Sequence, residues 1–329
     1  MPVNLASIRI VIAGQAVYGA VEVRIEQVGY FAADRFSVRL AVGHEPLAGL
    51  SFYAALNLQM IVIEAAMTAD GYTKLLTGQV DQVQIDLAVN EVILSGRDLA
   101  ARLIDAEISD SFINQTSSQI AEQLANRFGL MPNVTATTTP VGQYYQIDHA
   151  RSGLGLNSRF STAWNLLVQL AQLENYTLSV QGTILNFAPA LVGDAVVVPL
   201  TSCIDAEIVV TAALPVGATV KSWNTQNKAV ITKMAGNQTG TMTTLIRPNL
   251  SSIQAQALAT GHLAALGRHE TTLTLRLPGE LTIRPNMQIV FQGTDSNIDR
   301  SYMVDAVVRE IDVSHGFVET IRAHANVIE

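Results

Sequence analysis

The sequence is poor in charged residues, lysine and cysteine, and each shortage excludes a class of protein. Only 15% of the 329 residues are charged, where about 25% is usual for globular domains. Four of the 20 basic residues are lysines and the net charge is −8. The chain therefore lacks the basic patch that electrostatic binding to nucleic acid or anionic lipid requires. The single cysteine, Cys203, excludes a disulfide within the chain.

Signals for membrane insertion or export are also missing. The longest uncharged stretch, residues 46–63, contains Pro46, Gly49 and Asn57, so it predicts a loop and a strand rather than a membrane span. No charged region followed by an apolar core opens the sequence, so we expect no signal peptide. With 49% hydrophobic residues and few charges, much of the surface is expected to be buried against partner molecules.

Short runs rich in β-branched residues predict strands throughout residues 6–95, because Gly, Asp and Asn turns separate them. The run Gln82–Leu87 alternates strictly between polar and apolar residues, which is typical of a strand with one buried face. The pattern changes at residues 97–190. There Arg97–Asp105 has helical spacing, Thr116 is a predicted N-cap, and a second helix is expected from Thr162.

The order strand, polar turn, long strand, tight turn, strand occurs twice, over residues 60–94 and 287–321. Val80-Asp81 aligns with Val304-Asp305 at an offset of 224 residues, and Met60 aligns with Met287 at 227. We therefore predict an α+β, mainly β fold with two antiparallel β-barrel domains from an internal duplication. The first barrel is residues 1–96, an α/β insertion is residues 97–190, and the second barrel is residues 191–329 with an Ala-rich helix at 251–266.

The residues that carry chemistry in enzymes form no recognisable constellation. The pair Asp148-His149 has no Gly-x-Ser-x-Gly nucleophile to activate, and His262 with His269 lacks a neighbouring cysteine or carboxylate. The Gly153–Asn157 segment is too short for a dinucleotide loop. No catalytic, cofactor-binding or metal-binding residue is therefore predicted, and the protein is not expected to be an enzyme.

Several segments, in order, resemble the baseplate hub family of contractile-tailed phages, also called late control protein D, of Mu-like and P2-like phages. The family is related to the hub module of type VI secretion spike proteins. The resembling segments are Leu94–Asp105, Gln119–Gly129, Ala163–Ala171, Thr272–Gly279, Arg284–Met287, Tyr302–Val304 and Gly316-Phe317. They span residues 94–325, whereas the first ninety residues match in strand pattern only.

The resemblance implies a homotrimer in which each chain supplies two tube-like β-barrels to a pseudo-sixfold ring. Such a ring joins the hexameric tail tube to a trimeric central spike, beside baseplate wedge proteins, and leaves a channel for DNA. The protein would be part of the virion baseplate, assembled in the host bacterial cytoplasm. Because the sequence ends at Glu329, just after the last predicted strand, the spike is expected to be a separate protein.

Two sets of polar residues on the predicted long strands are candidates for the channel lining. They are Gln82, Gln84, Asp86, Glu310 and Asp312. An acidic lining would repel DNA phosphates and let DNA pass without adhering. The same residues are equally compatible with an outer surface. Two other functions remain open at this stage: a cell-wall hydrolase with its site in residues 97–190, and a receptor-binding tail protein.

Overall fold

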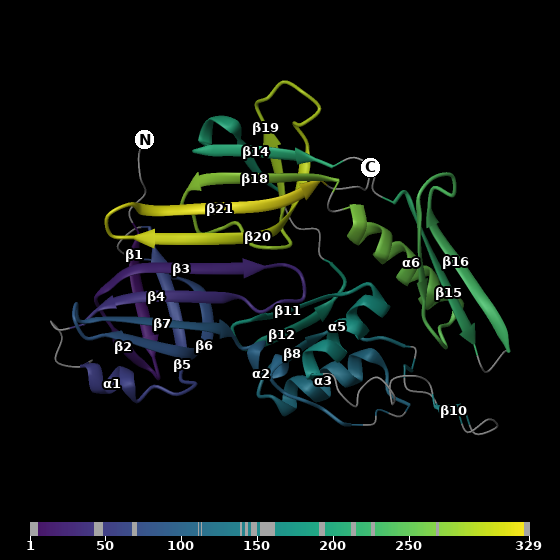
Figure 1. Ribbon diagram of the computed structural model, residues 1–329, viewed down its shortest axis with the longest axis horizontal. Helices are drawn as coiled ribbons and strands as arrows, with labels where there is room; N and C mark the ends of the chain where they lie inside the picture. The colour runs from purple at the N-terminus through teal and green to yellow at the C-terminus, as the bar shows by residue number, and fades with distance from the viewer. Residues whose placement is uncertain are drawn as a thin grey trace.

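The computed structural model describes residues 6–42, 49–67, 71–110, 112, 114–138, 140–141, 144–145, 150–151, 162–190, 195–211, 215–224, 228–267 and 270–325. The fold is α+β and mainly β, as predicted, with strands in two large units and helices gathered beside them (Figure 1). His44, Asp148-His149, His269 and the Gly153–Asn157 segment lie outside the described residues.

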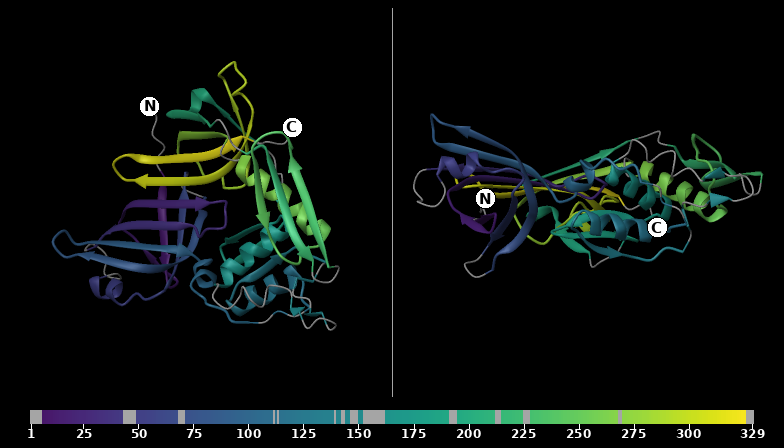
Figure 2. Two further views of the ribbon diagram at one scale, coloured as in Figure 1. Left: turned by 45° about the vertical axis from the view of Figure 1, so that its right-hand side comes forward. Right: turned by 90° about the horizontal axis from the view of Figure 1, so that it is seen from below.

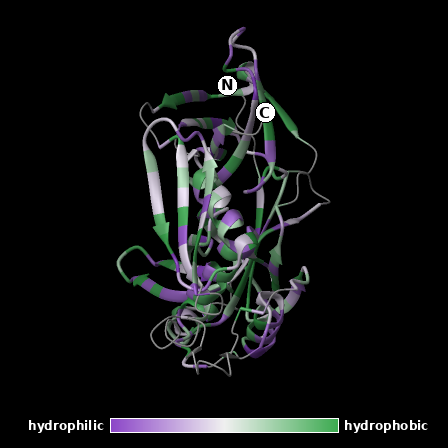
Figure 3. Cartoon of the chain, turned by 90° about the vertical axis from the view of Figure 1, so that its right-hand side faces the viewer, coloured by the Kyte–Doolittle hydropathy of each residue, from purple (hydrophilic) through white to green (hydrophobic). Residues whose placement is uncertain are grey.

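The first β-unit spans residues 7–98, where strands were predicted over residues 6–95. Its strands are β1 (Ser7–Ile12), β2 (Gln15–Val17), β3 (Ala20–Val28), β4 (Arg35–Ala41), β5 (Met60–Ala66), β6 (Thr73–Asp86) and β7 (Glu91–Asp98), with helix α1 (Leu50–Ala54) between β4 and β5. Alternate residues point inward, so Ile25, Val38 and Leu94 lie in one fully buried core while their sequence neighbours are more exposed. Figure 3 shows this alternation as hydrophilic and hydrophobic bands along the strands.

The second β-unit repeats part of this arrangement. It contains β13 (Val196–Pro199), the short 3₁₀ turn Leu200–Ser202, β14 (Asp205–Val210), β18 (Thr271–Pro278), β19 (Gln288–Gln292), β20 (Ser301–Asp312) and β21 (Gly316–Ala325). Its core, which includes Leu273, Val304 and Ile321, is separate from that of the first unit. Each β-unit therefore has its own core, although Ile311 and Phe317 from the β20–β21 hairpin pack into the core of the first unit.

The two β-units share one sheet. The strand order is β14-β18-β21-β20-β3-β4-β7-β6-β5-β1-β2, and β20 joins the units because its second half pairs with β3. In Figure 1, β21, β20, β3, β4 and β7 run side by side across the molecule. The sheet is thus continuous from one unit to the other.

The inserted residues form an α/β unit below this sheet (Figure 1). Its elements are α2 (Ala101–Ile104), α3 (Ser117–Arg127), β8 (Met131–Val134), β9 (Tyr144–Tyr145), β10 (Ala150–Arg151), α5 (Ala163–Glu174), β11 (Thr177–Gln181) and β12 (Ile184–Ala188). Thr116 caps α3 in a capping box with Gln119, as its sequence position predicts. The predicted helix Arg97–Asp105 is wrong in its first part, because Arg97 and Asp98 complete β7. Trp164 donates from Nε1 to the carbonyl of Phe31 at 2.8 Å and ties the insertion to the first β-unit.

A smaller layer interrupts the second β-unit between β14 and β18. It consists of β15 (Gly217–Asn224), β16 (Ala229–Gly236), β17 (Met242–Ile246) and the predicted Ala-rich helix, α6 (Ser252–Gly267). The helix packs on β15 and β16, where Val220, Ala255 and Ala259 are buried together. In the views of Figure 2 this layer lies apart from the two β-units.

Candidate functional surface

The internal duplication is visible in the strand pairing. In the first unit Met60, Ile61 and Val62 pair with Gln79, Gly78 and Thr77. In the second unit the corresponding pairs are Gln288–Met303, Ile289–Tyr302 and Val290–Ser301. The offset of 224 on the long strand agrees with the sequence alignment, but Met60 corresponds to Gln288 rather than to Met287. The turn between the two strands therefore differs by one residue from the predicted alignment.

Both units also carry a β-bulge at the same position. The pairing of β6 with β7 shifts at Asp81, and the pairing of β20 with β21 shifts at Asp305, which is 224 residues later. At each bulge the aspartate contacts a basic residue on the next strand. Arg97 Nε lies 2.6 Å from Asp81 Oδ2, and His324 Nδ1 lies 2.5 Å from Asp305 Oδ1. The register of the long strand and the bulge thus agree between the two units, whereas the outer strands differ, because β13 pairs with β19 in parallel and β1 pairs with β5 antiparallel.

Arg97 holds a second carboxylate as well. Its two terminal nitrogens donate to Asp105 at 2.9 and 2.8 Å, and these hydrogen bonds lower the pKa of Asp105 below its ordinary value. The same bonds raise the pKa of Arg97. The arginine therefore links the end of the first β-unit to the beginning of the insertion.

All five predicted lining candidates lie on one face of the shared sheet. Residues directly opposite each other in an antiparallel pair point to the same face. One row of residues that lie opposite each other crosses the five strands β20, β3, β4, β7 and β6. It consists of Glu310, Arg24, Ser37, Ser95 and Gln82. A second row runs Asp312, Glu22, Arg39, Ile93 and Gln84 in the same way. Asp86 follows Gln84 by two residues and so shares its face.

This face is lined with ion pairs rather than with acidic residues alone. Arg24 contacts Glu310, and Arg39 Nη2 lies 3.0 Å from Glu22 Oε2, with all four side chains largely exposed. The sequence reasoning missed these arginines, although Arg24 alternates with Glu22 and Glu26 along one predicted strand and Arg39 lies on the next. Because such pairs are exposed, each is worth at most about 1 kcal/mol. Their effect is to reduce the net negative charge of the face.

The hairpin at the end of β20 fixes Asp312. Its Oδ1 accepts hydrogen bonds from the backbone amides of Ser314 and His315 at 2.7 and 2.9 Å, and from the Ser314 hydroxyl. These bonds lower the pKa of Asp312, with the Ser314 hydroxyl contributing most. Asp312 is therefore ionised whenever the protein is near neutral pH.

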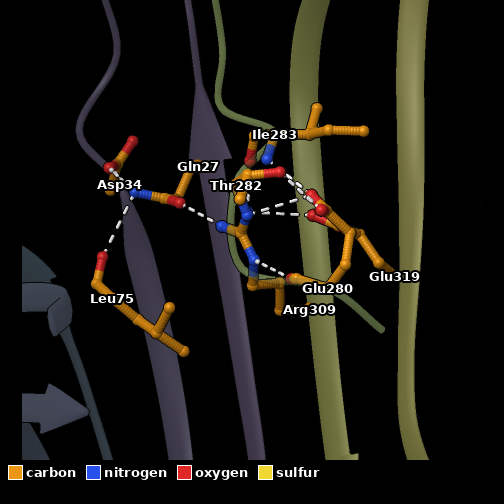
Figure 4. Close-up of polar contacts among 8 residues, drawn as sticks. All are labelled: Gln27, Asp34, Leu75, Glu280, Thr282, Ile283, Arg309 and Glu319. Atoms are coloured by element: carbon orange, nitrogen blue, oxygen red, sulfur yellow. Dashed lines mark hydrogen bonds and ion pairs between the residues drawn. The ribbon is translucent and has the colours of Figure 1, made fainter. Parts of the chain in front are cut away.

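The opposite, inward side of the junction between the units contains a buried polar network (Figure 4). Arg309 of β20 is 1% exposed and its Nη2 lies 2.9 Å from Oε1 of Glu319 on β21. Its Nη1 donates to Gln27 of β3 at 2.5 Å, and it also contacts the carbonyl of Ile283. Gln27 in turn donates to Asp34 at 3.2 Å. One guanidinium thus connects three adjacent strands.

Burial controls the ionisation of this network. It raises the pKa of Glu319 to about 8 and that of Asp34 to about 6. It also lowers the pKa of Arg309 below its ordinary value. The Arg309 charge opposes the shift at Glu319 without cancelling it. The junction is consequently sensitive to pH in a range where isolated carboxylates are fully ionised.

The described residues contain no group of three or more His, Cys, Asp or Glu side chains placed to hold a metal ion. His315 instead bonds to Asp312, and His324 to Asp305. Within the same part of the chain, no helix combines the length and apolarity needed to span a membrane.

Comparison with known proteins identifies the fold. No family model matches the sequence, and no curated protein matches it. The structure is similar to that of a tail protein from Neisseria meningitidis, with 15% identity, a TM-score of 0.73 and 98% of this chain and 97% of that chain covered. It is also similar to a prophage MuSo2 tail protein of 43 kDa from Shewanella oneidensis, with 16% identity, a TM-score of 0.72 and coverage of 97% and 98%.

A third similar structure is a component of the type VI secretion system of E. coli, with 10% identity and a TM-score of 0.61. The match covers 97% of this chain and 77% of that one. The fold of this protein is therefore the one found in phage tail proteins and in a type VI secretion component, over nearly its whole described length.

Proposed function

We propose that the protein is a structural component of a phage tail or of a related contractile machine, in which it forms a trimeric hub ring. The observation that carries this proposal is the pair of equivalent β-units joined in one sheet, with the same bulge in each. Three copies of a chain with two equivalent units provide six similar positions around an axis. A trimer built this way can match a hexamer on one face and a trimer on the other.

The proposed partners follow from that geometry. The face with six similar positions would contact a hexameric tail tube, and the threefold face would seat a trimeric central spike, with baseplate wedge proteins around the ring. The site of action is then the tail baseplate of the virion, after assembly in the bacterial cytoplasm. The fold shared with tail proteins supports this placement, and no enzymatic activity is part of it.

We further propose that the polar face carrying Gln82, Gln84, Asp86, Glu310 and Asp312 lines the bore of the ring. The alternation of acidic residues with arginines on this face supports a lining that is polar and well hydrated. A surface of this kind neither attracts phosphates strongly nor offers apolar contacts to DNA.

The absolute mass of the purified protein tests the ring. Multi-angle light scattering should give a mass three times 35.3 kDa at high protein concentration, and the bore should be visible in negative-stain images. A chain that remains monomeric at every concentration reached, and that forms no ring on electron-microscopy grids, would contradict the proposal.

A further inference from the structure

Among the open strand edges of the described residues, two lie at equivalent places in the two β-units. In the first unit β6 pairs with β5 only through its first half, and the edge of residues 82–86 has no strand beside it. In the second unit β14 pairs with β18 alone, so its other edge is also open. Open edges with unpaired backbone groups are sites at which another chain can add a strand.

The junction inside the chain shows how such edges pair. The second half of β20 is the counterpart of β6 residues 82–86, and it pairs with β3. The counterpart of β3 is β14, because β14, β18 and β21 pair in the same order as β3, β4 and β7. The junction β20–β3 therefore has one unformed equivalent, β6–β14: β14 is at one end of the sheet, and residues 82–86 of β6 extend past the part of β6 that pairs with β5.

We infer that β6 of one copy pairs with β14 of the next copy, antiparallel, and that this contact closes the ring. The inference rests on the proposed function and specifies its interface. The partner is a second copy of this chain because only the repeated unit supplies a strand with the required register. The contact is head-to-tail, and such contacts form rings when the rotation between copies closes.

The register can be transferred from the internal junction. Arg35 pairs with Arg97, and Thr272 pairs with His324, the counterpart of Arg97. Glu26 lies opposite Arg35 and Val209 lies opposite Thr272, so Val209 is the counterpart of Glu26. Glu26 pairs with Val308, which is the counterpart of Gln84. Gln84 of one copy should therefore pair with Val209 of the next.

The neighbouring pairs follow from this one, because the strands are antiparallel. The predicted pairs between copies are Val83–Val210, Gln84–Val209, Ile85–Ile208 and Asp86–Glu207.

The side chains on the core side of these pairs fit one another. Val83 and Ile85 pack at the margin of the first core, and Ile208 packs at the margin of the second. Val210 is 72% exposed in the single chain although it belongs to a strand. Pairing with Val83 would bury it and make the two apolar cores continuous from copy to copy.

The side chains on the polar face are less well matched. Asp86 lies opposite Glu207 in the predicted register, where the internal junction has the ion pair of Glu310 with Arg24. Like charges directly opposite each other weaken a strand pair. The contact between copies should therefore strengthen as ionic strength rises, in contrast to most ion-pair interfaces.

Disulfide trapping tests the register. The backbone hydrogen bonds from Gly29 to Asp305 and from Val313 to Val21 show that Val308 and Glu26 form a non-hydrogen-bonded pair. Gln84 of one copy and Val209 of the next should also form a non-hydrogen-bonded pair. Their Cα atoms would then lie about 4.5 Å apart, a distance that a disulfide can span. In a Cys203→Ser background, the double variant Gln84→Cys, Val209→Cys should give a covalent trimer after oxidation with diamide. A mixture of the two single variants should give a covalent dimer.

The matched control combines Gln84→Cys with Glu207→Cys, which shifts one partner by two residues to a diagonal position about 7–8 Å away. We expect at least about tenfold less cross-linking in this variant. Equal cross-linking in both variants, or a trimer by light scattering without the Gln84–Val209 bond, would overturn the strand pairing and leave the ring intact. A chain that is monomeric in all conditions would overturn the ring and the pairing together.

Discussion

Two equivalent positions of the sheet have opposite chemistry. At the internal junction, β20 and β3 enclose Arg309, Glu319 and Gln27. At the open edge of β6, the counterparts of Arg309 and Glu319 are Ile85 and Val92, which also lie directly opposite each other. The counterpart of Gln27 on β14 is Val210. One junction is polar and buried, and the other is apolar and partly exposed.

The difference reflects how each junction forms. The β20–β3 contact lies within one chain, so it is made without the loss of translational and rotational freedom that association requires. It can therefore tolerate the buried pair of Arg309 and Glu319, although its desolvation is costly. A contact between copies must supply net free energy of association, and apolar pairs provide it. The apolar residues at the β6 and β14 edges are those that the proposed contact between copies requires.

The largest expected effect is the loss of association when the apolar edge is charged. Val210→Lys should lower the association constant by about a hundredfold or more, because a buried unpaired charge costs several kcal/mol. Val313→Lys is a matched control, since Val313 is 69% exposed and lies at the tip of the β20–β21 hairpin, away from the open edges. Sedimentation equilibrium measures both variants. Equal weakening in the control would show that the edge has no special part in association.

The next effect concerns the stability of the internal junction. Arg309→Met removes hydrogen bonds to Gln27 and Ile283 and should lower the free energy of unfolding by about 2–4 kcal/mol. The double variant Arg309→Ile, Glu319→Val installs the residue types of the first unit and should recover most of this loss. Urea denaturation with monomeric samples gives both values. If the double variant is as unstable as the single one, the two junctions are not interchangeable in packing.

A pH dependence should also separate the two junctions. The pKa of Glu319 is about 8 when folded against an ordinary 4.5, and that of Asp34 is about 6 against 3.8. The folded state therefore binds these protons more tightly than the unfolded chain. The contribution of these two groups to the free energy of unfolding should therefore fall as pH rises from about 4 to 8.

Urea midpoints at pH 5, 6.5 and 8 measure that slope. The double variant Arg309→Ile, Glu319→Val lacks the Glu319 contribution and should show a shallower fall, above all between pH 6.5 and 8. An unchanged slope would place the pH-sensitive groups elsewhere in the chain.

The smallest expected effect is a gain in association. Glu207→Arg would place a cation opposite Asp86 and reproduce the Arg24–Glu310 pair of the internal junction. For an exposed cross-strand pair we expect the association constant to rise by up to about fivefold at low salt. The gain should shrink at high salt. Glu270→Arg makes the same change of charge just outside β18 and serves as the control.

Much of the fold could be predicted because its signals are local. Alternation predicted the strand at Gln82–Leu87, and the Thr116 cap predicted the helix that follows it. The strand end at Arg97 and Asp98 was missed, because Leu99–Leu103 imposes helical spacing on the residues before it. The strand β17 likewise depends on a distant partner, since it pairs with β15, whose residues lie over twenty positions earlier.

The candidate surface was predictable only in part. The polar positions Gln82, Gln84 and Asp86 could be assigned to one face of a strand, because alternation has a period of two. Glu310 and Asp312 lie on the same face as these residues because of the number of strands between β20 and β6 and the register of those strands. Neither can be read from the local sequence. The burial of Arg309 on β20 and of Glu319 on β21 was also unpredictable, since it depends on the pairing of these two strands with each other and of β20 with β3.

The sequence by itself determined the strand and helix periods, the caps and the duplication, because each depends on residues near one another or on direct repetition. Only the tertiary structure decided that β20 pairs with β3, which places Arg309 in the interior and leaves β14 and residues 82–86 of β6 with one edge unpaired. That pairing joins residues almost three hundred positions apart. Its free energy comes from contacts between the units and is not encoded in either segment alone.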